Sequence, residues 1–139
     1  MHPPWHPWRA LRRLTSWTLV FAPLPPGYLG VCDYATRTII LAPGQPQAQR
    51  RSTIAHEVEH AERGEAAPGW AAQDEARVRA AAARRLISIE ALVDAARWAR
   101  SWHELAEELW VDEDTARARV EHLAAGERAL IDAVVRDRG

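Results

Sequence analysis

Residues 56 to 60 read His-Glu-Val-Glu-His, and this short pattern constrains the chain more than any other feature. Residues four apart in an α-helix lie one above the other on the same face, so the two histidines can reach a common point. Glu57 projects at a neighbouring angle, where its carboxylate can reach the same region. The pattern therefore predicts a helix that presents two imidazoles and one carboxylate together.

The sequence around the pattern carries the signals of a half-buried helix. Pro46 suits the first turn, and Gly64 suits the position just past the last turn. Between them lies an apolar stripe at helical spacing, made of Ile54, Ala55, Val58 and Ala61. Such a stripe indicates that the helix packs on the core, with the histidines at its margin beside a cleft.

Two histidines and a glutamate in this order form the H-E-x-x-H arrangement of zinc hydrolases. We expect one Zn²⁺ per chain, with His56 and His60 as ligands and Glu57 as general base. A catalytic zinc takes three protein ligands and leaves one position for water. We predict Glu75 as the third ligand, with Asp74 as the alternative. The segment from about Trp70 to Ile87 reads as a second helix. Acidic residues are favoured at the start of any helix, so Glu75 and Asp74 also have an explanation that involves no metal.

Three short segments before the first helix favour β-strands, at residues 17–22, 28–33 and 37–41. The first strand must end at the proline-rich run Pro23–Gly27, and Asp33–Thr36 reads as a hairpin turn. We expect a small antiparallel sheet that precedes the metal helix, so the fold class is α+β. An exposed strand edge beside the metal could hold an extended peptide through main-chain hydrogen bonds.

The C-terminal third reads as helical, with Ser88 and Ser101 as helix starts. Within residues 101–123, four positions match a helix-turn-helix, namely Ala106, Val111, Thr115 and Val120. Trp110 stands where the tight turn usually has glycine. The second helix opens with three acids that would face DNA phosphates: Asp112, Glu113 and Asp114. We therefore expect a packing or protein-docking role, although Arg117 and Arg119 could still reach DNA.

Length and composition set the wider frame. A chain of 139 residues with a net charge of −1 predicts one domain, residues 1–139, with no bulk attraction to nucleic acid or anionic membranes. Residues 1–16 lack the apolar core of a signal peptide, and we expect them to be a loosely docked segment. No apolar run approaches the ~20 residues of a membrane helix. The single cysteine, Cys32, suits a reducing cytoplasm.

The order of these segments resembles the ImmA/IrrE-type metallo-endopeptidases of bacteria and phages. The residues that carry the resemblance are 53–60, 75–87 and 105–120, and it spans roughly residues 24–130. The chain departs from the commoner form at Glu59, where glycine is frequent, and at residues 80–83, which are four alanines where an aromatic is usual. The resemblance implies a cytoplasmic zinc endopeptidase whose protein substrate is a DNA-binding transcriptional repressor.

Two other functions remain open from the sequence. One is a DNA- or repressor-binding regulator that has a metal site but little proteolytic activity. The other is a small structural domain without metal.

A peptidase also needs a hydrogen-bond donor for the oxyanion. The sequence leaves four candidates for this donor, namely Tyr28, Tyr34, His103 and His122.

Overall fold

A computed structural model describes residues 5–138 of the chain. Over these residues the fold is α+β, as predicted. Its three strands are β1 (Thr18–Phe21), β2 (Gly30–Asp33) and β3 (Thr38–Leu41). Its helices are α1 (Pro7–Arg13), α2 (Gln47–Arg63), α3 (Ala71–Leu86), α4 (Ile89–Ala96), α5 (Trp102–Leu109), α6 (Glu113–Glu121) and α7 (Ala125–Asp137). No helix among the described residues is long and apolar enough to cross a membrane.

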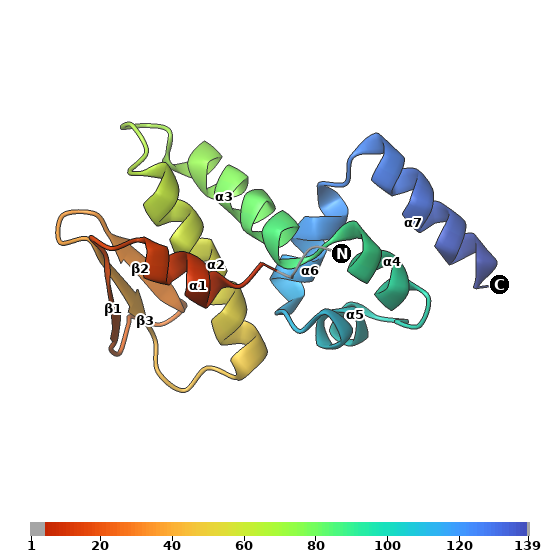
Figure 1. Ribbon diagram of the computed structural model, residues 1–139, viewed down its shortest axis with the longest axis horizontal. Helices are drawn as coiled ribbons and strands as arrows, with labels where there is room; N and C mark the ends of the chain where they lie inside the picture. The colour runs from red at the N-terminus through yellow and green to blue at the C-terminus, as the bar shows by residue number, and fades with distance from the viewer. Residues whose placement is uncertain (1–4, 139) are drawn as a thin grey trace.

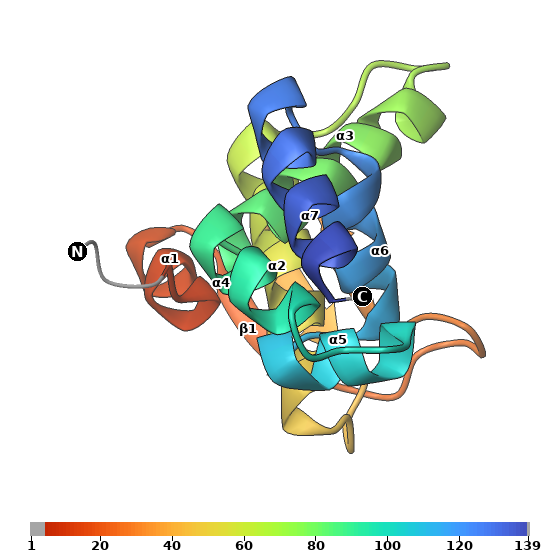
Figure 2. The same ribbon diagram turned by 90° about the vertical axis from the view of Figure 1, so that its right-hand side faces the viewer.

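Helix α2 lies between the two halves of the molecule. Figure 1 shows the sheet and α1 at one end and the helices α4 to α7 at the other, with α2 and α3 between them. Figure 2 looks onto the helical end, where α4, α5, α6 and α7 lie together. Ile54 and Val58 of α2 belong to the hydrophobic cluster with α1 and the sheet, whereas Ala55 belongs to the cluster with the later helices. Packing on both sides therefore fixes the position of α2.

The predicted ends of α2 are confirmed. Pro46 precedes its first residue, and Gly64 follows its last residue with a φ of 85°, a conformation that glycine adopts without steric cost. The stripe residues Ile54, Ala55 and Val58 are fully buried. Because both ends and the buried face are fixed, the rotation of α2 about its axis is fixed as well. That rotation decides where the histidines point.

The sheet is mixed, and the prediction of an antiparallel sheet was wrong for one of its two strand pairs. The hairpin of β2 and β3 is confirmed, and the side chain of Asp33 accepts a hydrogen bond from the backbone of Ala35 in its turn at 3.0 Å. The strand order, however, is β1-β3-β2, and β1 runs parallel to β3. Strand β3 therefore lies between β1 and β2.

The described part of the N-terminal segment, which the sequence predicts to be loosely docked over residues 1–16, contains a short helix. Within its described part, α1 buries Pro7, Ala10 and Leu11 against α2 and the sheet. The guanidinium of Arg85 lies 4.6 Å from the centre of the Trp5 ring, a cation–π contact. The remaining part of the predicted segment, residues 1–4, lies outside the described residues.

Gly30 brings the sheet into close contact with α2. A Cβ atom at this position would lie 2.7 Å from Thr53 Cγ2 and 3.1 Å from Glu57 Cγ. Any side chain at position 30 would therefore collide with the α2 face that carries Glu57. The absence of a side chain lets β2 begin directly beside the predicted general base.

Helices α5 and α6 meet at Trp110, which adopts the left-handed conformation with φ 56° and ψ 47°. This conformation is unfavourable for a residue with a side chain. Arg51 of α2 compensates, because it donates a hydrogen bond to the Trp110 carbonyl at 2.9 Å and its guanidinium lies 5.9 Å from the ring centre. The turn predicted at Trp110 is therefore present and is tied to α2.

Arg119 of α6 is a packing residue. It is 2% exposed, donates a hydrogen bond to the carbonyl of Ile87 at 2.8 Å and pairs with the carboxylate of Glu127 at 2.9 Å. The hydrogen bond from Arg119 lowers the pKa of Glu127 to about 2, so the pair is charged on both sides. Arg119 is therefore not available for contact with DNA, and the packing role favoured for this segment fits its position.

Candidate metal centre

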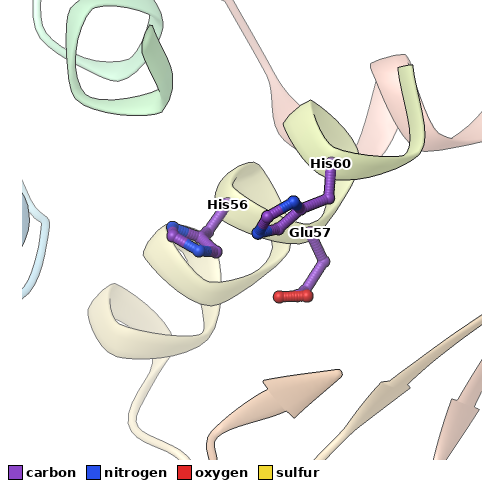
Figure 3. Close-up of side chains that lie close together, drawn as sticks. All are labelled: His56, Glu57 and His60. Atoms are coloured by element: carbon purple, nitrogen blue, oxygen red, sulfur yellow. The ribbon is translucent and has the colours of Figure 1, made fainter. Parts of the chain in front are cut away.

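Helix α2 places the three residues of the motif side by side. Figure 3 shows His56 and His60 projecting from successive turns of α2 and the carboxylate of Glu57 pointing toward the strands. The ring centres of the two histidines are 5.0 Å apart. Each of the three side chains offers a ligand atom, and these atoms all lie within 4.8 Å of one another. This spacing suits a group of atoms that share one metal ion.

Glu75 of α3 lies against both histidines. One oxygen of its carboxylate is 2.5 Å from His56 Nε2, and the other is 2.8 Å from His60 Nε2. Both Nε2 atoms therefore point at the same carboxylate. A cation held by the two Nε2 atoms would lie next to it.

Asp74 occupies a different position. Its carboxylate is 3.6 Å from Nδ1 of His60, the ring nitrogen on the far side from Glu75. A carboxylate in this place can orient an imidazole that binds metal through its other nitrogen. The structure thus brings Glu75 to the shared face of the histidines and places Asp74 behind His60. The choice of Glu75 as third ligand stays a prediction that this geometry favours.

The charges of the site favour a cation. Hydrogen bonds from His56 and His60 hold the pKa of Glu75 well below its usual range. Burial lowers the pKa of His56, but the hydrogen bond and charge of Glu75 raise it more, so the pKa lies above its ordinary value. The carboxylate is therefore ionised and stabilises positive charge on its partners. A divalent cation would supply that charge in place of protons.

Glu57 carries the main unsatisfied group of the site. The residue is 5% exposed, and within residues 5–138 its Oε2 atom has no hydrogen-bond partner. His60 Nδ1 is likewise buried without a partner within hydrogen-bond distance in that range. Burial raises the pKa of Glu57 more than the neighbouring histidines lower it. A buried oxygen without a partner is costly, and such groups are usually satisfied by water or serve a function. The residues present therefore fit a site for a metal ion and a water molecule.

A cleft of about 520 Å³ is lined by His56, Glu57 and Glu75 of the site. Its floor is α2, with Ser52, Thr53, His56 and Glu57. One wall is the segment 27–30 before and at the start of β2, and the other wall is formed by Glu75 and the start of α6. A concave surface with polar side chains at its base suits a bound ligand.

Several of these wall residues were missed as site residues by the sequence. Asp112, Asp114 and Thr115 line the cleft, whereas the sequence indicated a packing or protein-docking role for this helix start. Arg79, one turn after Glu75 on α3, contacts both carboxylate oxygens of Asp114, at 2.9 and 3.0 Å, and Glu121 at 3.1 Å. This arginine holds α6 beside the predicted third ligand. No local sequence signal could reveal a contact between residues so far apart in the chain.

Three of the four candidate oxyanion donors are committed to other contacts. The Tyr34 hydroxyl donates to the carbonyl of His60 at 3.3 Å, His103 pairs with Glu107 at 3.0 Å, and His122 Nδ1 lies 2.8 Å from the carbonyl of Ala118. Tyr28 is the member of this set that lines the cleft in the described part of the chain. Cys32 is half-buried, and burial raises its thiol pKa to about 12.

The comparisons with known proteins agree with this geometry. The family model described as the IrrE N-terminal-like domain, a peptidase family, matches residues 15–121. The matched range contains the three strands, α2, α3 and the cleft walls. No curated protein matches the chain, and no solved structure matches it.

Proposed function

Because this chain belongs to the IrrE N-terminal-like family of metallopeptidases, we propose that it is a zinc-dependent endopeptidase that cuts a peptide bond in a protein substrate. The observation that carries the proposal is the shared face of α2 and α3. There, two Nε2 atoms and the Glu75 carboxylate converge beside a buried Glu57 oxygen that has no partner within residues 5–138. This donor set, two imidazoles and one carboxylate, is a set that catalytic zinc sites use.

The residues that would hold the zinc are His56, His60 and Glu75. Asp74 would orient the ring of His60 through Nδ1. When bound, the metal supplies a Lewis acid that activates water and polarises the substrate carbonyl. With a substrate bound, the walls of the cleft would leave room near the site only for the water that the substrate does not displace.

Glu57 would move the proton. Its free oxygen accepts a proton from the attacking water as the new carbon–oxygen bond forms. The same carboxylic acid then gives the proton to the amine nitrogen as the carbon–nitrogen bond breaks. Burial favours this cycle, because it raises the pKa of Glu57 toward neutrality and so makes the carboxylate a better base.

Strand β2 would hold the substrate. It forms one edge of the sheet and begins at Gly30, which lines the cleft beside Glu57. An extended peptide that pairs with this edge forms main-chain hydrogen bonds, and these do not depend on the identity of its side chains. The pairing would bring the peptide along the α2 face that carries the motif.

Replacing Glu75 with alanine is expected to lower zinc affinity at least 10–100-fold, the range typical even of residues that support a ligand. Asp74→Ala is the matched control and should cost less, because its carboxylate lies on the Nδ1 side of His60. Titration with a fluorescent zinc chelator as competitor measures both affinities. The opposite ranking of the two variants would give the ligand role to Asp74.

We propose a DNA-binding transcriptional repressor in the cytoplasm as the substrate. The resemblance to ImmA/IrrE-type endopeptidases supports this choice. Asp112 lines the cleft and adds a negative charge to its wall, which suits a basic segment such as those of DNA-binding proteins. The half-buried Cys32 has no disulfide partner, which is compatible with a reducing compartment.

Cleavage of a native bacterial lysate tests the substrate proposal. New protein N-termini produced by the wild-type chain, and not by the Glu57→Gln variant, should fall in linkers of DNA-binding repressors. New N-termini confined to other protein classes would contradict the repressor. Their complete absence, with full zinc occupancy, would favour the alternative of a repressor-binding regulator with little proteolysis.

A DNA-binding regulator is the weaker alternative. Arg119 is buried, the guanidinium of Arg117 lies 4.7 Å from the centre of the Trp102 ring, and the start of α6 lines the cleft. The helix that would enter the major groove is therefore engaged within the protein. Tight, salt-sensitive binding of the wild-type chain to duplex DNA would revive this alternative.

A further inference from the structure

Peptide hydrolysis places negative charge on the former carbonyl oxygen in its transition state, and a well-placed hydrogen-bond donor stabilises that charge. We propose that the hydroxyl of Tyr28 is this donor. The inference rests on the proposed function, because it assigns a role within the same reaction. It is carried by the side chains that line the cleft and by the hydrogen bonds that they already make.

Four hydroxyl groups line the cleft, on Tyr28, Ser52, Thr53 and Thr115. Two of them are engaged within α2 and its entry. The Ser52 hydroxyl donates to the carbonyl of Ala48 at 3.1 Å, and the Thr53 hydroxyl lies 2.9 Å from the carbonyl of Gln49 and 2.8 Å from the Gln45 amide oxygen. Each hydroxyl has a single proton to give. Tyr28 and Thr115 therefore remain.

The charges of the neighbouring residues and the length of the side chain favour Tyr28 over Thr115 as the donor. Thr115 stands beside Asp112, whose carboxylate accepts a hydrogen bond from its backbone N–H at 2.8 Å. Asp114 precedes Thr115 directly and also lines the cleft, but its carboxylate is paired with Arg79 at 2.9 Å. The Asp112 carboxylate next to a developing oxyanion would repel it. Tyr28 stands on the opposite wall among Gly27, Leu29 and Gly30, which carry no charge, and its hydroxyl extends far beyond its backbone.

The backbone at Tyr28 is fixed, whereas its side chain is free to move. The Tyr28 N–H donates to the carbonyl of Pro25 at 3.1 Å, and the Leu29 carbonyl accepts from Ala42 N and from Gln45 Nε2, both at 2.9 Å. The side chain itself is 59% exposed. A phenol on a fixed loop can turn toward a substrate that enters the cleft without any change in the fold. The hydrogen bond to the oxyanion would order the Tyr28 side chain as it forms, so its energy must exceed that ordering cost.

The test compares Tyr28→Phe with the wild-type chain on a peptide selected from a tryptic library of bacterial proteins for cleavage by the wild type. Removal of one oxyanion donor lowers kcat by about 10²–10³-fold. We expect a loss in that range with KM and zinc content unchanged. A phosphinic analogue of the same peptide, which mimics the transition state, should bind Tyr28→Phe more weakly by a similar factor in calorimetry.

Thr115→Val is the matched comparison, because it removes the other unengaged hydroxyl from the opposite wall. A larger loss of kcat in Thr115→Val than in Tyr28→Phe would overturn the assignment. Unchanged kcat in Tyr28→Phe, or a change confined to KM, would also overturn it. Both results leave the proposed endopeptidase standing. A zinc-loaded wild-type chain that cleaves nothing in the library would instead contradict the proposed function.

Discussion

Alanine in place of His56 or His60 is expected to lower zinc affinity by more than about 100-fold and to abolish peptide cleavage. Each substitution removes one of three protein ligands, whereas loss of a group that only supports a ligand already costs about 10–100-fold. The wild-type chain should hold about one zinc ion. Mass spectrometry of the native protein, purified without a histidine tag, measures the stoichiometry.

His103→Ala is the control for these variants. His103 is exposed and pairs with Glu107 on α5, away from the cleft residues. It should keep the full zinc content and activity of the wild type. The metal site proposed here is wrong if both His56→Ala and His60→Ala retain one zinc ion per chain.

Glutamine in place of Glu57 is expected to leave the fold and the zinc content intact while lowering kcat about 10²–10⁴-fold, the usual contribution of a general base. The amide is nearly the same size as the carboxylate and fits the buried site, but it cannot accept the water proton. Zinc content and the rate of peptide cleavage, measured on the same preparation, separate chemistry from metal binding.

Glu62→Gln provides the matched control from the same helix. Its carboxylate pairs with Arg85 at 3.2 Å at the surface, so its loss should leave kcat unchanged. Undiminished cleavage by Glu57→Gln would remove Glu57 from the mechanism. Loss of zinc from Glu57→Gln would instead make Glu57 a ligand.

The sequence predicted the metal helix well because its signals are local. Pro46, Gly64 and the buried stripe lie within or next to the helix, and all three act through neighbouring turns. The serine caps are local in the same way: Ser88 and Ser101 each accept a hydrogen bond from the backbone N–H three residues later. Motif residues on such a helix can be placed from the sequence alone.

The sheet and the cleft walls depend on contacts between distant residues, and these could not be predicted. The sequence of β1 does not predict which strand will pair with it, because its backbone N–H and C=O groups can bond to a parallel or an antiparallel neighbour. The sequence named Glu75 and Asp74 as the two choices for the third ligand, and the side of His60 that each carboxylate faces depends on the rotation of α3 against α2. The role of Arg79 depends on a partner on α6.

The helix-turn-helix-like part is joined to the site too closely to be exchanged as a module. Arg51 of α2 holds the carbonyl at its turn, Arg79 of α3 holds Asp114, and Ser52 accepts a hydrogen bond from the Asp112 N–H at 3.0 Å. A graft of α5 and α6 from a relative would have to bring suitable partners for these three residues. A graft without such partners would change the shape of the cleft as well as the exposed surface of α5 and α6. Protein engineers who want a new specificity should therefore vary exposed side chains on these helices and leave the three anchoring residues in place.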